Sequence, residues 1–547
     1  MKFTVSTILL LNLVTQVPAV PTSSRATAPT VLLPDARYQG FHNATSGLDV
    51  FLGIRYAQAP VGNLRWRAPK APVPENKLVQ ATSQPAKCFQ LNLLGDADST
   101  PGVPDPTEDC LFLNVFAPPL SAHKKKLPVL VWIHGGGYFA GYAASYDPTA
   151  MIRASNNSFV AVIIQYRLGM FGFLPGSEVK KNGALNAGLC KYLLYKDSAF
   201  SDVFNSFPVD MQFALKWTQK NIHLFGGDSS QVTIWGESAG AGGIMMQVVA
   251  NGGKTKPALF KRAIASSTYI PPNYNYNDPQ AELQYASLVS NTGCKNATNT
   301  LACLRGLDYA TLAAGSTQLP RPVVDGTFLT QRPQLSLAKK QVNGESLISL
   351  HNVDEGRIFV APSANSTVQS WTTQQFPKLS PQNVTAVENA YKVFASSGAS
   401  AADNIYNIQT WIFGEAEFVC PSFWLVDAFS KVGYQGLFAV PPSLHSLDLN
   451  VYFPGSSSIQ PAQPFSQSLV QSFMGALVSF IVTGTPNSNP MNKTINPNWP
   501  VYNSKSPKGM TFNVTASGAA DTKLEAVNPA LRQRCDLWRT LAPYTPL

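Results

Sequence analysis

Hydrophobic runs and helical repeats alternate along this chain of 547 residues. Apolar runs rich in β-branched residues at 129–133, 160–166 and 232–235 have the length of buried strands, whereas residues 211–225 have the spacing of an amphipathic helix. This alternation is typical of an α/β fold, in which helices cover both faces of a mostly parallel sheet. We therefore predict an α/β architecture with a mostly parallel central sheet.

Two longer stretches, roughly 270–320 and 360–440, lie between the core runs, and we predict that both are helical insertions that build the mouth of a site. Proline is abundant near 316–334 and 484–500, which predicts surface loops there. No linker rich in proline, glycine or serine, no charge block and no internal repeat divides the chain. We therefore expect one large domain over residues 20–547, although this length would ordinarily suggest several domains.

The N-terminus has the features of a secretory signal peptide. Met1-Lys2 precedes an apolar stretch from Val5 to Val14, and Val17-Pro18-Ala19 fits a small-residue cleavage site. This pattern predicts removal of residues 1–19 and secretion, with a buried N-terminal helix as the alternative. The apolar stretch is too short to span a membrane as a helix, and no other stretch is long enough, so we expect a soluble mature chain without a transmembrane segment.

Charge and composition argue against several classes of partner. The formal net charge is +10, yet the longest basic run is Lys124-Lys125-Lys126, which argues against a nucleic acid as partner. A positive surface that attracts anionic polysaccharide or membrane is an alternative to a plain solvated face. The sequence contains no metal-binding motif and no phosphate- or dinucleotide-binding loop, so we expect neither a metal nor a cofactor.

Two glycine-rich segments follow strand-like runs and favour acyl-transfer chemistry. Gly236-Glu237-Ser238-Ala239-Gly240 comes directly after 232–235, where a serine on a sharp strand-to-helix turn would be an exposed nucleophile. His134-Gly135-Gly136-Gly137-Tyr138 follows 129–133, and backbone N–H groups there could reach an oxyanion because no side chain blocks the approach. Taken singly, the first segment is also compatible with an ordinary turn and the second with a flexible loop.

These segments occur among several others in the order found in the type-B carboxylesterase/lipase family of α/β-hydrolases, which includes cholinesterases and secreted fungal lipases. The chain resembles this family nearly from end to end. The matching segments are FLGIRYA at 51–57, PVGNLRW at 60–66, EDCLFLNV at 108–115, HGGGY at 134–138, YRL at 166–168, GESAG at 236–240 and VDEG at 353–356. The resemblance implies an α/β-hydrolase fold and hydrolysis of small-molecule or lipid esters through an acyl-enzyme intermediate.

The resemblance also suggests the catalytic residues. In such hydrolases the nucleophile, the acid and the base follow in that order, and only His351 and His445, of six histidines, lie downstream of Ser238. His351 directly precedes the segment that resembles the acid motif, so we assign His445 as the base. Glu355 resembles the family's acid, with Asp354 as the rival carboxylate. The oxyanion hole would consist of three backbone N–H groups, those of Gly136, Gly137 and Ala239.

Cysteines and glycosylation sequons also fit an extracellular protein. Six of the seven cysteines match the family's three disulfides, which the resemblance pairs as Cys88 with Cys110, Cys294 with Cys303, and Cys420 with Cys535. From the sequence alone the connectivity stays open, and Cys190 is left over. Seven Asn-x-Ser/Thr sequons are candidate glycosylation sites: Asn43, Asn156, Asn296, Asn365, Asn383, Asn492 and Asn513.

The chain departs from the family pattern at residues 190–209. Family members run from Asn-x-Gly-Leu almost directly into an Asp-Gln-type helix, but here this segment separates Leu189 from Asp210. We interpret it as a retained intron, because codons for Cys190-Lys191-Tyr192 can contain a donor-like GTAAGT and those for Pro208-Val209 an acceptor-like CAG. Its removal would be in frame and would leave one phenylalanine codon between Leu189 and Asp210. The alternative is a genuine surface loop, for instance a substrate-gating insertion.

The first disulfide loop bears on the choice of ester. In cholinesterases this loop carries the choline-binding tryptophan and in fungal lipases the flap, but here residues 89–109 contain no tryptophan and have an acidic, proline-rich second half. We therefore expect no cholinesterase activity, and we favour an esterase for soluble esters over an interfacial lipase or steryl esterase. Four residues could line an acyl pocket or belong to the core: Tyr138, Phe139, Met245 and Met246.

The family also contains adhesion proteins that keep the fold and lack catalysis. Such proteins usually lack the nucleophile, whereas Ser238, Glu355 and His445 are all present here. We therefore expect a secreted serine carboxylic-ester hydrolase rather than a non-catalytic binding protein.

Overall fold

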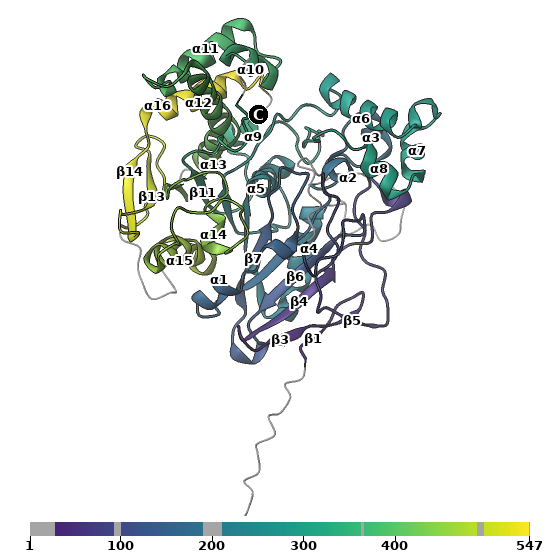
Figure 1. Cartoon of the computed structure of the whole chain (residues 1–547). Helices are drawn as coiled ribbons and strands as arrows, with labels where there is room; N and C mark the ends of the chain where they lie inside the picture. The colour runs from purple at the N-terminus through teal and green to yellow at the C-terminus, as the bar shows by residue number, and fades with distance from the viewer. Residues whose placement is uncertain are drawn as a thin grey trace, which may run out of the picture.

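A sheet of eleven strands forms the centre of the molecule within the residues that the computed structural model describes, which are 28–91, 100–189, 210–362, 366–429, 432–488 and 497–545 (Figure 1). From one edge to the other the strands are β14 (Ala520–Ala526), β13 (Lys508–Val514), β12 (Gly433–Phe438), β11 (Ser346–Asn352), β10 (Arg262–Ser266), β9 (Gly227–Glu237), β7 (Leu127–Ile133), β8 (Val160–Ile164), β6 (Phe112–Ala117), β4 (Leu48–Arg55) and β3 (Phe41–Asn43).

Parallel pairing dominates the middle of this sheet. Neighbouring strands from β8 through β7, β9, β10, β11 and β12 to β13 all pair in parallel. Antiparallel pairs lie at the two ends, where β14 pairs with β13 and where β8, β6, β4 and β3 follow one another. A separate small sheet contains β1 (Thr30–Leu32), β2 (Arg37–Gln39) and β5 (Leu78–Gln80). The predicted α/β architecture with a mostly parallel sheet is confirmed.

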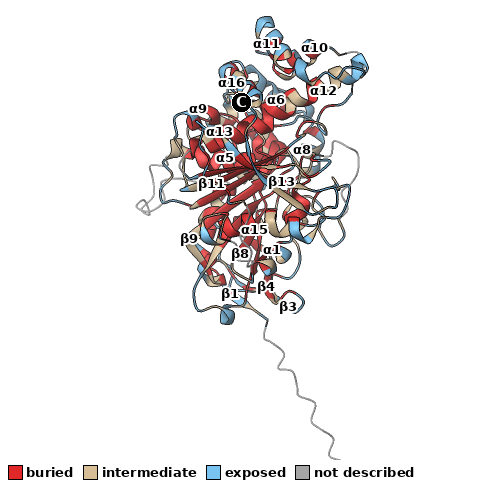
Figure 2. Cartoon of the chain, turned by 90° about the vertical axis from the view of Figure 1, so that its left-hand side faces the viewer, coloured by how far each residue is buried: buried red, intermediate tan, exposed pale blue. Residues whose placement is uncertain are grey.

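Side chains of the central strands alternate between two buried layers. On β7, Val131 and Ile133 belong to one hydrophobic cluster, whereas Leu130 and Trp132 belong to a second cluster on the opposite face. The first cluster is covered by α4 (Asp210–Asn221), α5 (Ala239–Val249), α9 (Pro333–Ala338), α13 (Cys420–Ala428) and α16 (Pro529–Leu541). The second is covered by α1 (Thr149–Ala154), α14 (Leu449–Tyr452) and α15 (Gln467–Thr483). The strands are therefore buried on both faces, as Figure 2 shows.

The predicted core elements form where the periodicity placed them. β7 covers the predicted run at 129–133, β8 covers 160–164 of the predicted run at 160–166, and β9 extends the third run as far as Glu237. The predicted helix at 211–225 is α4, followed by a turn of 3₁₀ helix at Ile222–Phe225.

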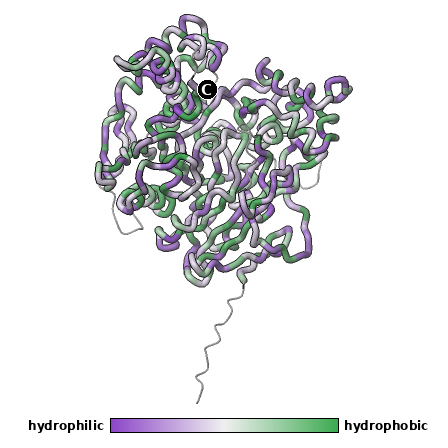
Figure 3. The backbone as a smooth tube through the Cα atoms, in the orientation of Figure 1, coloured by the Kyte–Doolittle hydropathy of each residue, from purple (hydrophilic) through white to green (hydrophobic). Residues whose placement is uncertain are grey.

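Both long insertions are helical, and Figure 1 shows them as two lobes above α5. The first contains α6 (Pro279–Asn291), α7 (Thr300–Gly306) and α8 (Tyr309–Gly315), which pack on a third hydrophobic cluster. The second contains α10 (Val368–Gln375), α11 (Pro381–Tyr391), α12 (Ala401–Gly414) and α13. Hydrophilic positions recur along both lobes (Figure 3). The predicted helical range 360–440 is wrong at its end, because β12 pairs there between β11 and β13.

The two proline-rich stretches are irregular, but the prediction that they are surface loops is wrong for part of each. Phe328 and Leu329 are fully buried in the first hydrophobic cluster. Trp499 is also buried and packs against Tyr434 and Phe512. Proline prevents regular pairing of the backbone, whereas the aromatic and aliphatic side chains anchor both stretches to the core. Residues 489–496 lie outside the described residues.

The three expected disulfides are present: Cys88 with Cys110, Cys294 with Cys303, and Cys420 with Cys535. Among the sequons, Asn156 and Asn296 are exposed, Asn43, Asn383 and Asn513 are half-buried, and Asn365 and Asn492 lie outside the described residues. No helix in the described ranges has both the length and the apolarity needed to cross a membrane. Residues 1–19 and 190–209, with Cys190, also lie outside the described residues.

The two ends of the described chain that flank 190–209 lie next to each other. The N–H of Asp210 donates to the carbonyl of Ala187 (3.3 Å), and the N–H of Met211 donates to that of Gly188 (3.4 Å). The Asp210 carboxylate also forms an ion pair with Arg167, with two oxygen–nitrogen distances of 2.8 Å. This buried pair joins the start of α4 to the segment that follows β8.

Candidate active site

Ser238 lies on a strained turn between the end of β9 and the start of α5. Its backbone angles, φ 56° and ψ −125°, are unusual for a residue with a side chain. A Cβ on Gly236 would lie 2.5 Å from the carbonyl carbon of Gly240, and one on Gly240 would lie 2.1 Å from the Ile133 oxygen. Glycine is therefore required at both positions for strand and helix to approach so closely, and the turn has the shape that the GESAG segment predicts.

The glycine segment after β7 packs directly against this turn. A Cβ on Gly135 would lie 3.1 Å from the Ser238 Cβ. Gly136 and Gly137 have positive φ angles of 99° and 61°, and neither N–H donates a hydrogen bond to the described part of the chain. Ala239 opens α5, so its N–H also lacks an intrahelical acceptor. These three backbone N–H groups thus donate no hydrogen bond that the described residues show.

Glu355 and His445 come together because they follow neighbouring parallel strands, β11 and β12, whose carboxyl ends lie at the same edge of the sheet. His445 Nδ1 lies 2.6 Å from Glu355 Oε2, within hydrogen-bond distance. The two loops are also tied by Ser443, whose hydroxyl accepts from the Val353 N–H (2.9 Å) and donates to the Phe438 carbonyl (2.6 Å).

The Glu355 carboxylate is buried and fully supplied with hydrogen bonds. Its Oε1 accepts from the Ser267 hydroxyl (2.7 Å) and from the Asn352 N–H (2.6 Å), and its Oε2 faces His445. Burial alone would raise the pKa of Glu355, but the charge of His445 and these three hydrogen bonds outweigh burial and lower the pKa. Glu355 is therefore held in its charged form.

On the other side of the imidazole lies Glu237, the residue that precedes the nucleophile. His445 Nε2 is 3.2 Å from Glu237 Oε1, but this approach lacks hydrogen-bond geometry, since Oε1 has no hydrogen-bond partner among the described residues. Burial raises the pKa of Glu237 to about 8, although the charge of His445 acts in the opposite direction. Burial would lower the pKa of His445, but the charges of Glu237 and Glu355 and the hydrogen bond to Glu355 raise it. The position of Glu237 inside GESAG, next to Ser238, indicates that it lies near the nucleophile, but the sequence alone does not show that it faces His445.

The rival residues lie in other environments. Asp354 forms an ion pair with Arg357. The Nδ1 atom of His351 lies 2.9 Å from the Asn352 carbonyl, its ring packs on Phe423, and burial lowers its pKa. Of the two carboxylates and two histidines considered, the structure brings together only Glu355 and His445.

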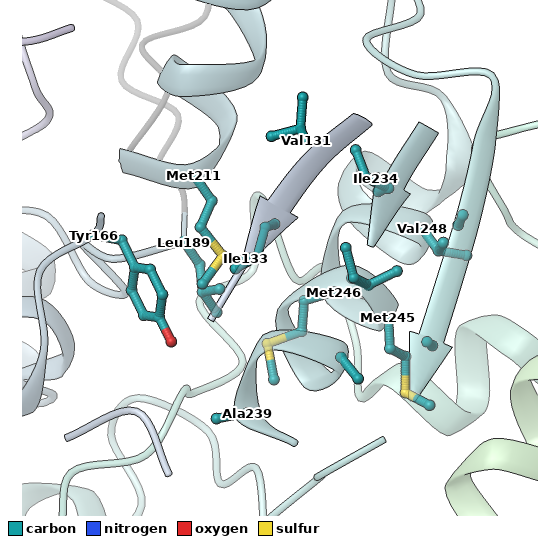
Figure 4. Close-up of a cluster of buried hydrophobic side chains, with 14 of the residues drawn as sticks. Val131, Ile133, Tyr166, Leu189, Met211, Ile234, Ala239, Met245, Met246 and Val248 are labelled. Carbon is teal, nitrogen blue, oxygen red and sulfur yellow. The ribbon is translucent and has the colours of Figure 1, made fainter. Parts of the chain in front are cut away.

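Of the four residues considered for an acyl pocket, three lie in the first hydrophobic cluster and Phe139 does not. Met245 and Met246 on α5 are buried in the first hydrophobic cluster with Val131, Ile133 and Met211 (Figure 4), so they belong to the core. Tyr138 is also buried, and its hydroxyl donates to the Tyr269 carbonyl (3.1 Å). Phe139 lies over Gly137, where a Cβ would meet its ring at 2.4 Å. In the described ranges no group of histidine, cysteine and carboxylate side chains is arranged to hold a metal ion.

Comparison with known families gives a match over most of the chain. The Carboxylesterase family model matches residues 27–191 and 205–538. This chain belongs to the carboxylesterase family. The unmatched residues 192–204 of this carboxylesterase fall inside the extra segment 190–209.

Individual relatives include fungal lipases. The carboxylesterase is 34% identical over 392 residues to "Secreted lipase 1" of Botryotinia fuckeliana, an alignment that spans 65% of each chain and thus slightly less than two thirds of that relative. It is 33% identical to "Secreted triacylglycerol lipase LIP1" of Gibberella zeae, over 71% of this chain and 69% of that protein. Among solved structures, Aspergillus niger EstA aligns with a TM-score of 0.81 and 28% identity, over 95% of this chain and 99% of that one. The fold of the carboxylesterase is thus the α/β-hydrolase fold of this family.

Proposed function

We propose that this carboxylesterase hydrolyses carboxylic esters with Ser238 as nucleophile, His445 as general base and Glu355 as the acid that orients it. The observation that carries the proposal is the His445–Glu355 hydrogen bond of 2.6 Å, made beside a serine on a strained strand-to-helix turn. Ser238, Glu355 and His445 follow β9, β11 and β12, and His445 Nε2 lies 3.2 Å from Glu237, the residue before Ser238; this placement supports a serine hydrolase.

The proposed reaction follows from the position of each group. His445 takes the proton of Ser238 as its oxygen attacks the ester carbonyl, and ionised Glu355 stabilises the imidazolium that results. The N–H groups of Gly136, Gly137 and Ala239 receive the developing oxyanion. His445 then protonates the leaving alcohol. Water repeats the sequence on the acyl-enzyme and releases the acid.

The test is hydrolysis of p-nitrophenyl esters from acetyl to palmitoyl, below and above the concentration at which each substrate aggregates, with Ser238→Ala as the control. We expect Ser238-dependent turnover that is highest with short acyl chains and shows no increase at aggregation. Absence of Ser238-dependent turnover at every chain length would contradict the proposal and would favour a non-catalytic binding protein.

A second candidate function is that of an interfacial lipase. One relative is named a secreted triacylglycerol lipase, which favours this alternative. A steryl esterase is the other alternative with a lipid substrate. Part of the first disulfide loop, 92–99, lies outside the described residues, so our preference for soluble esters rests on its sequence. An optimum at long acyl chains with a rise at aggregation would select the lipase.

We propose that the carboxylesterase is secreted after removal of residues 1–19 and is glycosylated. Two relatives are named secreted lipases, and the three disulfides suit an oxidising compartment. Exposed Asn156 and Asn296 are the best-placed sequons. Mass spectrometry of protein from the culture medium, before and after glycosidase treatment, tests both points. An intact Met1 would overturn the proposed removal of residues 1–19. Unmodified sequons would overturn the proposed glycosylation.

We also propose that in the competent chain a single phenylalanine replaces residues 190–209. If one residue joined Leu189 to Asp210, the observed bonds from Asp210 to Ala187 and from Met211 to Gly188 would each connect residues four positions apart. This is the spacing of an α-helix, so α4 would begin one turn earlier without a break. Transcript sequencing tests the proposal, and codons 190–209 intact in the dominant mRNA would overturn it.

A further inference from the structure

Between α12 and α13 the chain forms a π-helical turn at Glu415–Val419, in which all five residues are buried. Such a turn contains one residue more than an α-helical turn, and π turns occur often at functional sites. The added residue rotates the side chains that follow it relative to a regular α-helix. The π turn therefore determines which side chain points toward the candidate active site.

Helix α16 holds this π turn at both of its ends. The Glu415 carboxylate accepts hydrogen bonds from Arg534 Nε (2.7 Å) and Nη2 (2.6 Å), and a third from the Tyr391 hydroxyl (2.7 Å). Cys420, which follows the turn, is bonded to Cys535, the next residue of α16. With a buried ion pair at one end and a covalent bond at the other, the turn has little freedom to move.

The residue that the π turn directs to the site is Phe418. Its ring lies 4.6 Å from the His445 ring, measured between centroids, and stacks on Tyr269 at 5.1 Å and on Phe359 at 5.2 Å. The N–H of Tyr269 in turn donates to the Ser238 carbonyl (3.2 Å). Phe418 therefore borders both the proposed base and the segment beside the proposed nucleophile.

Phe418 is fully buried, and its ring packs among the aromatic side chains beside His445. It is 0% exposed, yet it lies in none of the three hydrophobic clusters, whereas Ala416, Val419 and Phe423 all belong to the first. Its stacking partner Phe359 is 45% exposed and lies 5.0 Å from the His445 ring, so both rings contact His445 but only Phe359 reaches the surface. The Phe418 ring thus packs behind the exposed Phe359 ring and against His445, so it limits how far both of these side chains can move.

Resting on the proposed function, we propose that Phe418 determines substrate specificity by limiting the size of the ester group that lies beside His445. A ring held this rigidly cannot give way to an added methyl group, because packed interiors tolerate little extra volume. The site then excludes esters that are branched at the carbon next to the ester linkage. The branch can lie on the acid or on the alcohol side of the ester, so the test uses esters of both kinds.

The experiment compares the wild type with Phe418→Ala, Phe418→Leu and the control Phe413→Ala. Phe413 is an aromatic neighbour in the same lobe whose ring contacts Phe418 and Phe359. One substrate series pairs p-nitrophenyl acetate with p-nitrophenyl trimethylacetate, and the other pairs ethyl acetate with isopropyl acetate. The readout is the ratio of kcat/KM for the branched ester to that for the linear ester.

We expect Phe418→Ala to raise this ratio about tenfold or more in at least one series, because one methyl group in an apolar pocket changes selectivity by this order. Phe418→Leu should give an intermediate value, and Phe413→Ala should leave the ratio within about twofold. An unchanged ratio in both series would overturn the proposal. So would loss of all turnover in both Phe418 variants, since the ring would then serve to support His445. Failure of the proposed function would appear separately, as wild-type turnover that does not depend on Ser238.

Discussion

Glu355 and Glu237 lie on opposite sides of His445 and are almost equally buried, at 1% and 2% exposure. On one side, Glu355 receives hydrogen bonds from Ser267 and Asn352 and a close contact from His445, and its pKa is lowered. On the other, Glu237 Oε1 has no hydrogen-bond partner in the described part of the chain, and its pKa is raised to about 8. Hydrogen bonding, and not burial, decides which carboxyl group is charged.

The difference gives the two sides of His445 different roles. At neutral pH Glu355 is ionised and stabilises the imidazolium, whereas Glu237 is mostly protonated. A second full negative charge beside the imidazole would raise its pKa further and reduce the fraction of neutral base. Each of the following substitutions changes one side of this arrangement.

The largest effect is expected for Glu355→Gln. A neutral amide cannot stabilise the imidazolium and can present an N–H to Nδ1, which favours the wrong tautomer, so kcat for p-nitrophenyl acetate should fall about 10⁴-fold. Glu237→Gln is the matched control. At pH 7 it replaces a mostly protonated acid by an amide of similar shape, so its loss should stay below about tenfold. Equal losses in the two variants would contradict the comparison.

A smaller effect is expected for Ser267→Ala, which removes one hydrogen bond to Glu355 and leaves the residue's positive φ of 53° equally strained. A hydrogen bond to a charged group contributes about 1.5–3 kcal/mol, so kcat should fall by about 10- to 100-fold. The control is Ser349→Ala, a buried serine on β11 whose hydroxyl donates to the Ser422 carbonyl. We expect it to retain kcat within about twofold. Similar losses for both serines would indicate a general structural effect.

The smallest effect concerns stability. Because the folded-state pKa of Glu237 is raised from 4.5 to about 8, the unfolded chain binds fewer protons between these values, and the free energy of unfolding falls as pH rises through this window. Glu237→Gln removes this titration and with it the fall in the free energy of unfolding. The Tm of the variant relative to that of the wild type should therefore be higher at pH 8 than at pH 5 in calorimetry. A difference in Tm that does not vary with pH would show that Glu237 titrates normally.

The parts of the molecule that local patterns encode were predictable. Strands β7, β8 and β9, helix α4, and the strained turn at Ser238 follow from hydrophobic runs and from glycines that are close in sequence. The resemblance to a family supplied the disulfide pairs and singled out Glu355 and His445, whose contact joins residues 90 positions apart.

Features that depend on packing between distant segments were not predictable. Nothing near Glu237 in the sequence shows that its Oε1 atom has no hydrogen-bond partner among the described residues, because donors would come from other loops. The π turn likewise depends on Glu415 meeting Arg534, 119 residues away. The loop at Trp499 was misassigned for the same reason. Its proline-rich composition predicts a surface loop, but the Trp499 side chain packs in the core against residues from distant segments.

The attachment of the π turn to α16 also bears on when the molecule becomes complete during synthesis. Cys420 leaves the ribosome 115 residues before Cys535, its partner. At elongation rates of roughly 5–20 residues per second, this interval lasts on the order of ten seconds. Throughout it the Cys420 thiol and the Glu415 carboxylate lack the partners that α16 later supplies. On the proposed secretory route, lumenal chaperones and oxidoreductases therefore meet Cys420 and Glu415 before α16 pairs with them.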